Sequence, residues 1–365
     1  MLEVDVSKRL GSMEFHAAFT APGGVTALFG RSGAGKTSLV NMLGGLLRPD
    51  RGHIRLDGRV LFDAEAGIDL PPERRRLGYV FQDARLFPHL TVAANLRYGT
   101  PRGARDEGRH DSVEFDAVVE VLGLAALLQR RPATLSGGER QRVAIGRALL
   151  AAPELVLMDE PLASLDMPRR REILPFVEAM HERFAVPVVY VTHNMGEIVR
   201  LADQLALISD GHVVAAGPVE EVTLRLDMAD VFGRQDSGAV VRAHIVGHDE
   251  TDQLSRLALD GAELWVPHLD GPVGAPLRLR IRARDVSLAL QPPAQTSVLN
   301  VLAGRVAEIG PQDGPQVDVL VDCGVRLWAR ITRRSLRELG LAPGRPVYAL
   351  IKSVSVDRQS LGGRL

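Results

Sequence analysis

Short apolar runs alternate with helix-like patterns along the first part of the chain, from Met1 to about Phe232. The clearest runs are Leu155 to Met158 and Val188 to Val191, and Val25 to Phe29 is a further, mostly apolar run. Continuous apolar runs of this length are typical of strands buried on both faces, and their alternation with helices is typical of a parallel sheet covered by helices. Met1 to Val6 alternates apolar and acidic residues, which predicts a further strand. The pattern predicts an α/β domain over residues 1–232.

Helical periodicity replaces this alternation between about Asp83 and Leu150. It is clearest from Phe115 to Leu128, where apolar residues recur at the spacing of one helix face. We therefore predict a helical subdomain, residues 83–150, inserted into the α/β domain. A separate helix is predicted from Lys36 to about Leu47.

After Phe232 glycine and proline become frequent, and the apolar runs shorten between turn signals. This texture predicts strands and a small β-barrel over residues 233–365, with two related halves around Gly271 and Pro292-Pro293. A linker is expected from Arg234 to Gly238. The predicted strands include Val241 to Val246, Leu277 to Ile281, Val317 to Val321 and Val347 to Ile351.

Composition and charge agree with a globular chain of more than one domain. At 365 residues the chain exceeds the usual size of a single hydrophobic core. With 44 Lys+Arg against 45 Asp+Glu, the net charge of −1 gives no bulk attraction to nucleic acid or anionic lipid. The arginine clusters 74–76 and 169–171 are interpreted as solvated faces rather than binding patches.

Other features of the sequence bear on its compartment. The single Cys323 excludes an internal disulfide, which fits a reducing compartment. No segment approaches the roughly 18 uninterrupted apolar residues that would span a bilayer, and the N-terminus lacks the blocks of a signal peptide. We expect the chain to stay in the cytoplasm.

Gly30 to Thr37 matches the phosphate-binding P-loop pattern, and it lies between a predicted strand and a predicted helix. Its glycines let backbone N–H groups surround phosphates, while Lys36 neutralises phosphate charge and the Thr37 hydroxyl holds Mg²⁺. The alternative, a tight turn without a ligand, is disfavoured by the flanking elements. The predicted nucleotide-binding residues here are Gly30, Arg31, Ser32, Gly33, Ala34, Gly35, Lys36, Thr37 and Ser38.

Two acids, Asp159 and Glu160, end the buried run that begins at Leu155. In open α/β sheets the carboxyl ends of the strands form the edge where ligands bind. Asp159 is therefore placed to act on the Mg²⁺ shell, and Glu160 to accept a proton from the water that attacks the γ-phosphate. A plain turn or helix cap is the alternative interpretation of two adjacent acids.

The order of further motifs resembles that of the ATP-binding subunits of ATP-binding-cassette (ABC) transporters. These motifs are Gln82 in Tyr79-Val80-Phe81-Gln82, Leu135-Ser136-Gly137-Gly138-Glu139, Ser164-Leu165-Asp166, and His193 in Val191-Thr192-His193-Asn194. The resemblance implies a homodimer that sandwiches two ATP molecules head to tail.

In that arrangement Ser136, Gly137 and Gly138 of one copy complete the P-loop site of the other. A Ser-Gly-Gly before a helix offers a hydroxyl and open N–H groups suited to a γ-phosphate. The resemblance also implies that Gln82 bridges Mg²⁺ or the attacking water, and that His193 contacts the γ-phosphate and steadies Glu160. The aromatic residue that commonly stacks on adenine has no clear counterpart; Phe15 and Phe19 are the candidates.

The C-terminal region resembles the oligobinding barrels of importer ATPases, and several stretches are similar to those of molybdate importers. The stretches are residues 281–290, 298–306, 329–336 and 349–353, and the barrel match is strongest over residues 292–356. Ser297, Lys352 and Ser353 are of the type that binds a tetrahedral oxyanion. Related domains have an arginine where this chain has Leu299. A barrel that regulates or dimerises without a ligand is the alternative.

The function expected from the resemblance is ATP hydrolysis coupled to uptake of an oxyanion, foremost molybdate, at the cytoplasmic face of the membrane. The implied partners are two integral-membrane permease subunits and, indirectly, an external substrate-binding protein. A tungstate, sulfate, iron or sugar importer is an alternative. A soluble DNA-processing ATPase is disfavoured, because it would carry a long heptad insertion or Cys-pair metal sites, and the sequence has neither. A translation-associated ATPase is disfavoured because it would usually carry a second P-loop, which the sequence lacks. An oxyanion-storage protein would explain only the C-terminal half.

Overall fold

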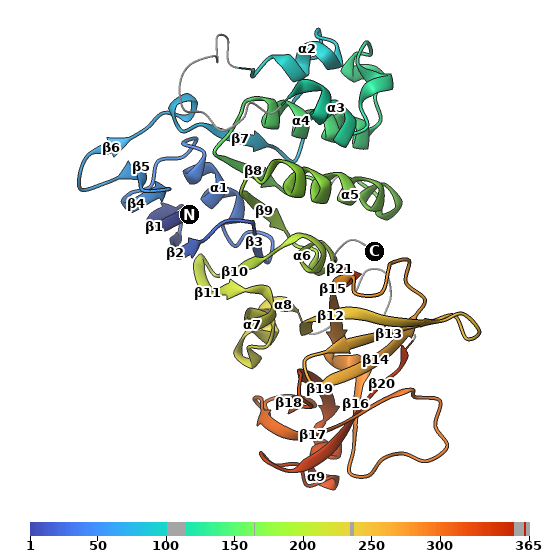
Figure 1. Ribbon diagram of the computed structural model, residues 1–365. Helices are drawn as coiled ribbons and strands as arrows, with labels where there is room; N and C mark the ends of the chain where they lie inside the picture. The colour runs from blue at the N-terminus through green and yellow to red at the C-terminus, as the bar shows by residue number, and fades with distance from the viewer. Residues whose placement is uncertain (101–113, 164, 234–236, 354–360, 363–365) are drawn as a thin grey trace. The chain divides into compact units, whose positions relative to one another are not determined.

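The computed structural model of the chain describes residues 1–100, 114–163, 165–233, 237–353 and 361–362. The described chain divides into two compact units. The first consists of Met1–Asn194 and Ala202–Ala216, and the second of Met195–Leu201 and the chain from Gly217 onward. Figure 1 labels helices and strands of both units.

The strands that build the sheet of the first unit are β1 (Leu2–Leu10), β2 (Met13–Ala21), β3 (Val25–Gly30), β4 (Arg51–Leu56), β5 (Arg59–Asp63), β6 (Ile68–Asp69), β7 (Leu77–Val80), β8 (Leu155–Asp159), β9 (Val188–Thr192), β10 (Gln204–Ser209) and β11 (His212–Pro218). Its α-helices are α1 (Lys36–Leu43), α2 (Val92–Arg97), α3 (Phe115–Val121), α4 (Gly137–Leu150) and α5 (Met167–Phe184).

These strands form one sheet in the order β6-β5-β4-β1-β2-β11-β10-β3-β9-β8-β7. The strands from β10 to β7 run parallel, whereas β1, β2, β4, β5 and β6 pair antiparallel. The parallel part confirms the α/β prediction, because its strands β3, β8 and β9 are buried along their whole length. The carboxyl ends of parallel neighbours meet at one edge, so residues that follow β3, β9, β8 and β7 lie along that edge.

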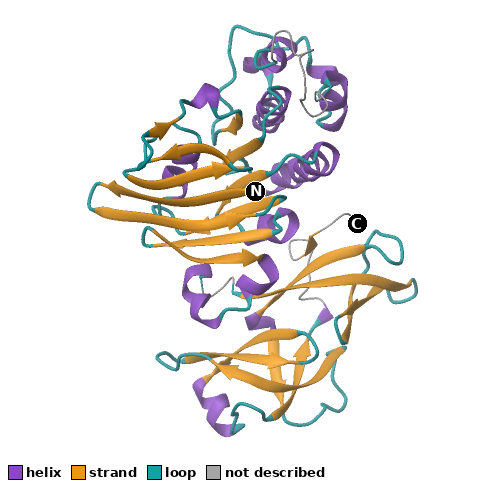
Figure 2. Ribbon diagram, turned by 60° about the vertical axis from the view of Figure 1, so that its left-hand side comes forward, coloured by secondary structure: helices purple, strands orange, loops and turns teal. Residues whose placement is uncertain are grey.

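Helices cover the parallel part of this sheet (Figures 1 and 2). Helix α1 contacts β3, β8 and β9, and helix α4 contacts β7. Helices α2, α3 and α5 in turn pack on α4. The region predicted as a helical subdomain therefore contains α2, α3 and all of α4 in its described part, with α4 as the helix that joins it to the sheet.

Two predicted helices end earlier than expected. Helix α1 ends at Leu43 rather than about Leu47, because Gly44 is its C-cap and Gly45 turns the chain with a left-handed φ of 75°. Helix α3 ends at Val121 rather than Leu128, and Gly123 follows with a φ of 59°. In both cases a glycine inside an apolar periodic stretch ends the helix.

The second unit holds strands β12 (Gly238–Asp249), β13 (Leu254–Leu259), β14 (Ala262–Pro267), β15 (Pro276–Arg282), β16 (Val286–Ala289), β17 (Asn300–Ile309), β18 (Gln316–Asp322), β19 (Arg326–Thr332), β20 (Pro346–Ile351) and β21 (Leu361–Gly362). Its α-helices are α6 (Met195–Leu201), α7 (Val219–Thr223), α8 (Ala229–Phe232) and α9 (Arg333–Glu338).

In the part of this unit that the structure describes, the strands form two antiparallel five-stranded sheets, in the orders β14-β13-β12-β15-β21 and β16-β20-β17-β18-β19. Their inward residues share one apolar core that includes Val241, Leu279, Val319 and Val347. This confirms the all-β prediction for the C-terminal region. The predicted boundary after residue 232 stays a prediction. The compact units part between Ala216 and Gly217, shortly before α7 (Val219–Thr223), which packs on β12.

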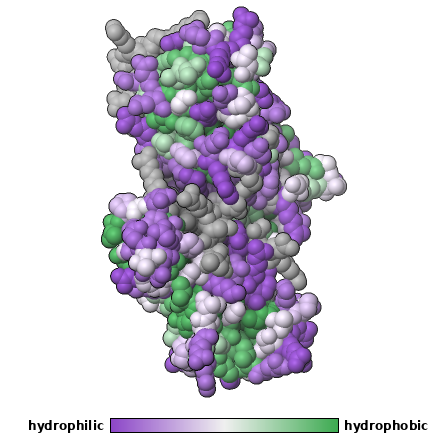
Figure 3. Space-filling view, turned by 90° about the vertical axis from the view of Figure 1, so that its right-hand side faces the viewer, coloured by the Kyte–Doolittle hydropathy of each residue, from purple (hydrophilic) through white to green (hydrophobic). Residues whose placement is uncertain are grey.

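The surface mixes polar and apolar residues. On the face drawn in Figure 3, hydrophilic residues and smaller apolar patches are interspersed. Across the described residues, no helix is both long and apolar enough to cross a bilayer.

Candidate nucleotide site

The sequence motifs lie at the ends of four neighbouring parallel strands. The P-loop follows β3, His193 follows β9, Asp159 ends β8, and Gln82 lies two positions beyond the end of β7. Because β3, β9, β8 and β7 are adjacent in that order, the sheet brings together residues that are up to 163 positions apart in the sequence, Gly30 and His193. This edge of the sheet is where the site is built.

The P-loop has the backbone that phosphate binding requires. Gly35 precedes α1 with a left-handed φ of 100°, and a Cβ built there would lie 2.6 Å from the Phe15 ring, so only glycine fits. No side chain caps α1, which leaves the N–H groups of its first turn facing the loop. Arg31, Ser32 and Gly33 are exposed. An anion can therefore reach a positive helix end.

Lys36 crosses the inside of this loop. Its Nζ donates hydrogen bonds to the carbonyl oxygens of Gly30 at 2.8 Å and Arg31 at 3.0 Å. Burial lowers the pKa of the Lys36 ammonium from its ordinary value, while the Glu160 and Asp159 carboxylates partly oppose that shift. A buried cation beside an open anion-binding loop is suited to phosphate oxygens, which would replace the hydration that Lys36 lacks.

Thr37 and Asp159 meet across the site. The Thr37 Oγ1 hydroxyl donates to Asp159 Oδ1 over 3.2 Å. Burial raises the pKa of the Asp159 carboxyl; repulsion from Glu160 adds to the rise, and the hydrogen bond from Thr37 opposes it. A hydroxyl and a carboxylate are hard oxygen ligands, and a divalent cation would stabilise the ionised form that burial disfavours. The pair fits Mg²⁺.

Glu160 and His193 form the next contact along the edge. His193 Nδ1 lies 3.5 Å from Glu160 Oε2. Glu160 also has a left-handed φ of 44°, a conformation that is uncommon for a residue with a side chain, while its N–H donates to the Val191 carbonyl over 3.1 Å. Observed strain of this kind clusters at functional sites, where the surrounding structure holds it.

Gln82 is the exposed residue two positions beyond the end of β7. In the described residues its side chain has no hydrogen bond, so it is open to a ligand. The rings of Tyr79 and Phe81 just before it stack at 4.0 Å, and the Tyr79 hydroxyl donates to Asn41 Oδ1 over 2.9 Å. Burial raises the pKa of Tyr79, and the charge of Asp159 adds to the rise. The charge of Asp159 is thus felt at Tyr79, three positions before Gln82.

Ser136 starts helix α4 as its N-cap. The Ser136 hydroxyl accepts from the Glu139 N–H over 3.2 Å, and the Ser136 N–H donates to Glu139 Oε2 over 2.7 Å, which is a complete capping box. Gly137 and Gly138 are the first helical residues. Within the described part of the chain, no hydrogen bond or ion pair joins these three residues to the P-loop.

Several sequence interpretations need correction. Phe15 and Phe19 are both buried in the core, 0% and 8% exposed, so neither offers an open ring to adenine. Arg75 is not on a solvated face: it is fully buried, and its Nη1 donates to the carbonyls of Met42 and Leu43 at the end of α1. Ser164 lies outside the described residues.

Arg170 is a further residue that the sequence interpretation assigned to a solvated face. Its Nε donates to the Leu165 carbonyl over 2.8 Å and its Nη2 to the Ala163 carbonyl over 3.0 Å. Arg170 therefore binds backbone carbonyls of the segment that follows Asp159 and Glu160. No sequence signal distinguishes it from Arg169, which is exposed.

The candidate oxyanion residues lie at one end of a sheet in the second unit. Asn300 pairs with Ile351 in the antiparallel register of β17 and β20, so the residues before Asn300 and after Ile351 run side by side. Ser297 and Lys352 are exposed, whereas Ser353 is buried and accepts a hydrogen bond from Asn300 Nδ2 over 3.3 Å. The oxyanion site stays a prediction.

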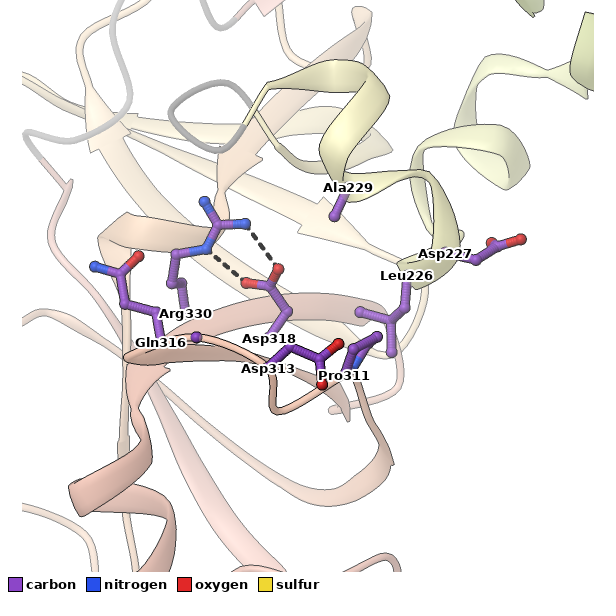
Figure 4. A pocket seen from close by; sticks show the side chains of 9 residues that line it. Leu226, Asp227, Ala229, Pro311, Asp313, Gln316, Asp318 and Arg330 are labelled. Atoms are coloured by element: carbon purple, nitrogen blue, oxygen red, sulfur yellow. Dashed lines mark hydrogen bonds and ion pairs between the residues drawn. The ribbon is translucent and has the colours of Figure 1, made fainter. Parts of the chain in front are cut away.

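The second unit also contains a cavity of about 120 Å³, which is lined by charged residues that include Arg330 and Asp318 (Figure 4). Arg330 in its wall donates from Nε and Nη2 to the two Asp318 oxygens, both over 2.7 Å. That cation is already paired, Asp313 adds negative charge to the wall, and Asp227 is paired with Arg225, so the cavity is unsuited to an oxyanion.

The chain is similar to known proteins over nearly its whole length. The ABC transporter family model matches residues 18–163, and the TOBE domain model matches residues 296–357. The chain is 51% identical over 362 residues to the molybdenum import ATP-binding protein ModC of Paramagnetospirillum magneticum, covering 98% of each chain. It is 52% identical over 362 residues to ModC of Yersinia pestis, covering 99% of each. The chain belongs to the ModC family of molybdenum import ATP-binding proteins.

Membership of the ModC family confirms the sequence-based resemblance to importer ATPases. It also confirms the fold class, a nucleotide-binding α/β cassette followed by an all-β region. Among solved structures, the dimeric bacterial ABC transporter cassette MJ0796 is 25% identical and has a TM-score of 0.47, covering 60% of this chain and 98% of that chain.

Proposed function

We propose that this ModC-family chain hydrolyses MgATP as the energy-supplying subunit of a molybdate importer. The observation that carries the proposal is the order of the strand ends: P-loop, His193, Asp159-Glu160 and Gln82 follow β3, β9, β8 and β7, which are adjacent. Phosphate binding, metal binding and a general base thus share one edge of one sheet.

Phosphate binding belongs to the P-loop. The backbone N–H groups of Gly33 to Thr37 surround the β- and γ-phosphates, and Lys36 exchanges its carbonyl contacts for phosphate oxygens. Burial disfavours the charged form of Lys36, and phosphate oxygens beside the ammonium would stabilise that form, which supports binding of the triphosphate.

Thr37, Gln82 and Asp159 would hold Mg²⁺. When bound, the ion neutralises charge on the phosphates and on the transition state. The Thr37 hydroxyl would then turn from Asp159 to the ion, because both oxygens are needed as ligands. Asp159 stays ionised beside the cation, against the effect of its burial.

Glu160 orients the attacking water and accepts its proton. Its carboxylate is only partly buried, with 21% of the side chain exposed, and His193 lies beside it at 3.5 Å. A hydrogen bond from His193 would fix the Glu160 carboxylate and leave its other oxygen for the water. His193 would also contact the γ-phosphate.

A second copy of the chain completes the site. Ser136 and the N–H groups of Gly137 and Gly138 stand at the positive end of a 14-residue helix. In a head-to-tail homodimer they would face the γ-phosphate bound by the partner. ATP then stabilises the closed dimer by its higher affinity for that state, and hydrolysis reopens it.

Closure is transmitted to two integral-membrane permease subunits at the cytoplasmic face, through the surface near Gln82 and Phe87. An external substrate-binding protein would deliver the cargo to those subunits. The C-terminal region would sense the cargo through Ser297, Lys352 and Ser353. Leu299, which is 54% exposed, provides no cation there, so we expect this oxyanion site to be weak.

Uptake by cells tests the proposal. Cells that lack this chain should lose accumulation of labelled molybdate, and the wild-type chain should restore it while Lys36→Met does not. Sulfate, iron and sugar uptake in the same cells serve as controls. Unchanged molybdate uptake with loss of any of these would contradict the molybdate assignment. Calorimetric titration of the purified chain with molybdate, tungstate and sulfate tests the C-terminal site separately.

A further inference from the structure

Helix α4 holds the backbone on the N-terminal side of Gln82. Gln141 of this helix is 3% exposed, and its Nε2 donates to the carbonyl of Phe81 over 3.3 Å. Phe81 is the residue directly before Gln82. Below this contact α4 lies against β7 so closely that a Cβ on Gly78 would come within 3.0 Å of the Ala148 carbonyl oxygen. The strand end that carries Gln82 is thus fixed to α4.

The same helix holds the backbone on the C-terminal side of Gln82. Arg147 donates from Nη1 to the Arg85 carbonyl over 2.9 Å and from Nη2 to the Ala84 carbonyl over 3.2 Å. Its guanidinium also stands 5.3 Å from the centre of the Phe87 ring. Burial lowers the pKa of Arg147, and no carboxylate contributes to the shift. The guanidinium of Arg147, which is only partly buried, therefore binds backbone carbonyls of the Gln82 segment.

We infer that Gln141 and Arg147 are positioning residues that make Gln82 move with helix α4. The two contacts enclose Gln82 and Asp83 from both sides, and they come from the helix whose N-cap is Ser136. A displacement of Ser136 along the helix axis would therefore displace Gln82, because a 14-residue helix transmits it as a rigid body of about 21 Å.

The inference deepens the proposed function and rests on it. In the proposed dimer Ser136 touches the partner's ATP and Gln82 belongs to the chain's own site. Closure around the partner's ATP would then displace helix α4, and α4 would displace Gln82 in the chain's own ATP site. Gln82 would reach its position for hydrolysis only when the same chain's Ser136 has engaged the partner's nucleotide.

Arg142 offers a matched control on the same helix. Its Nη1 donates to the carbonyls of Leu122 over 2.8 Å and Gly123 over 3.3 Å, and its guanidinium lies 4.7 Å from the Phe176 ring centre. Burial lowers its pKa as it does for Arg147. Arg142 therefore makes the same kinds of contact, but to the turn after α3 instead of the Gln82 segment.

A double-mutant cycle on the full-length chain tests the inference. The kcat and KM of ATP hydrolysis are measured for Arg147→Met and Arg142→Met, each with Gln82 present and with Gln82→Ala. We expect Arg147→Met to lower kcat about 10-fold with Gln82 present and less than about 2-fold without it, with KM changed by less than about 3-fold. Arg142→Met should lower kcat by the same factor in both backgrounds. Arg147→Lys should restore part of the loss.

Equal effects of Arg147→Met in the two backgrounds would overturn the inference, and so would a Gln82→Ala variant with wild-type kcat. Should Arg147→Met fail to fold, Gln141→Leu takes its place in the cycle under the same criterion. A wild-type chain that hydrolyses no more ATP than Lys36→Met would instead contradict the proposed function.

Discussion

His193 Nδ1 lies 3.5 Å from Glu160 Oε2, although the two residues follow different strands, β9 and β8. The register of these strands aligns Asp159 with Val191, which places the residues after them next to each other. The imidazole is half exposed and the carboxylate mostly covered, 51% and 21% of the side chains. A carboxylate held at one oxygen keeps the other available to a water molecule.

The Glu160→Gln variant should hydrolyse ATP roughly 10²- to 10⁴-fold more slowly, because the amide cannot accept the proton of the attacking water. ATP binding should persist, since the P-loop is unchanged. Steady-state phosphate release and equilibrium binding of ATP measure the two effects. Normal hydrolysis by this variant would show that the base has been assigned wrongly.

The Asp159→Asn variant should be more stable than the wild-type chain at neutral pH without nucleotide. Burial raises the pKa of Asp159, so the folded state binds its proton more tightly than the unfolded state. Stability is therefore lost as pH rises from the ordinary value, about 3.9, through the folded pKa, and the amide avoids that loss.

Thermal melts of the two proteins at pH 4 and pH 7.5 measure this effect. The Tm advantage of Asp159→Asn should appear at pH 7.5 and shrink at pH 4. Hydrolysis by the variant should fall at least about 100-fold, because a Mg²⁺ ligand is lost. A lower Tm at pH 7.5 than the wild-type value would contradict the assigned cause of the pKa shift.

The Ser136→Ala variant should lose helix stability and hydrolysis by separate routes. Removing the N-cap hydroxyl should cost about 1 kcal/mol in the free energy of unfolding. Glu139→Gln is the control, because it weakens the same capping box while leaving the Ser136 hydroxyl in place. In denaturant melts both variants should be destabilised, but only Ser136→Ala should lose most ATPase activity. Equal activities would argue against a phosphate contact of Ser136.

The Arg75→Met variant should lower the free energy of unfolding by about 3 kcal/mol, because it leaves the carbonyls of Met42 and Leu43 and the Asp69 carboxylate without their buried partner. The neighbouring Arg74→Met is the control, since Arg74 is exposed. Urea unfolding measures both. A similar small change in the two variants would contradict the capping role of Arg75.

The sequence predicts the site better than it predicts the residues that support the site. Lys36, Thr37 and Asp159 are recognisable because the chemistry of phosphate and Mg²⁺ fixes residue types at short spacing beside a strand. Arg75 and Arg147 are not recognisable, since each binds carbonyls that are brought near only by the folded chain. The residues that flank an arginine in the sequence do not predict whether its side chain will be buried.

The ends of helices and strands also depend on contacts that the sequence pattern does not show. Strand β8 extends one residue beyond the predicted run, to Asp159, because backbone pairing with β9 continues there. Helix α1 ends before its predicted end because Gly44 and Gly45 allow a turn that Arg75 then secures. The apolar pattern alone favours a longer helix.

The structure of the full-length Glu160→Gln variant with MgATP is the most direct test of the central claim, that two copies build each ATP site. The account predicts a dimer in which Ser136 Oγ of one copy lies about 3 Å from a γ-phosphate oxygen of the ATP on the other copy's P-loop. A triphosphate bound by one chain alone, with the Ser136 residues of both copies far from any phosphate, would contradict it.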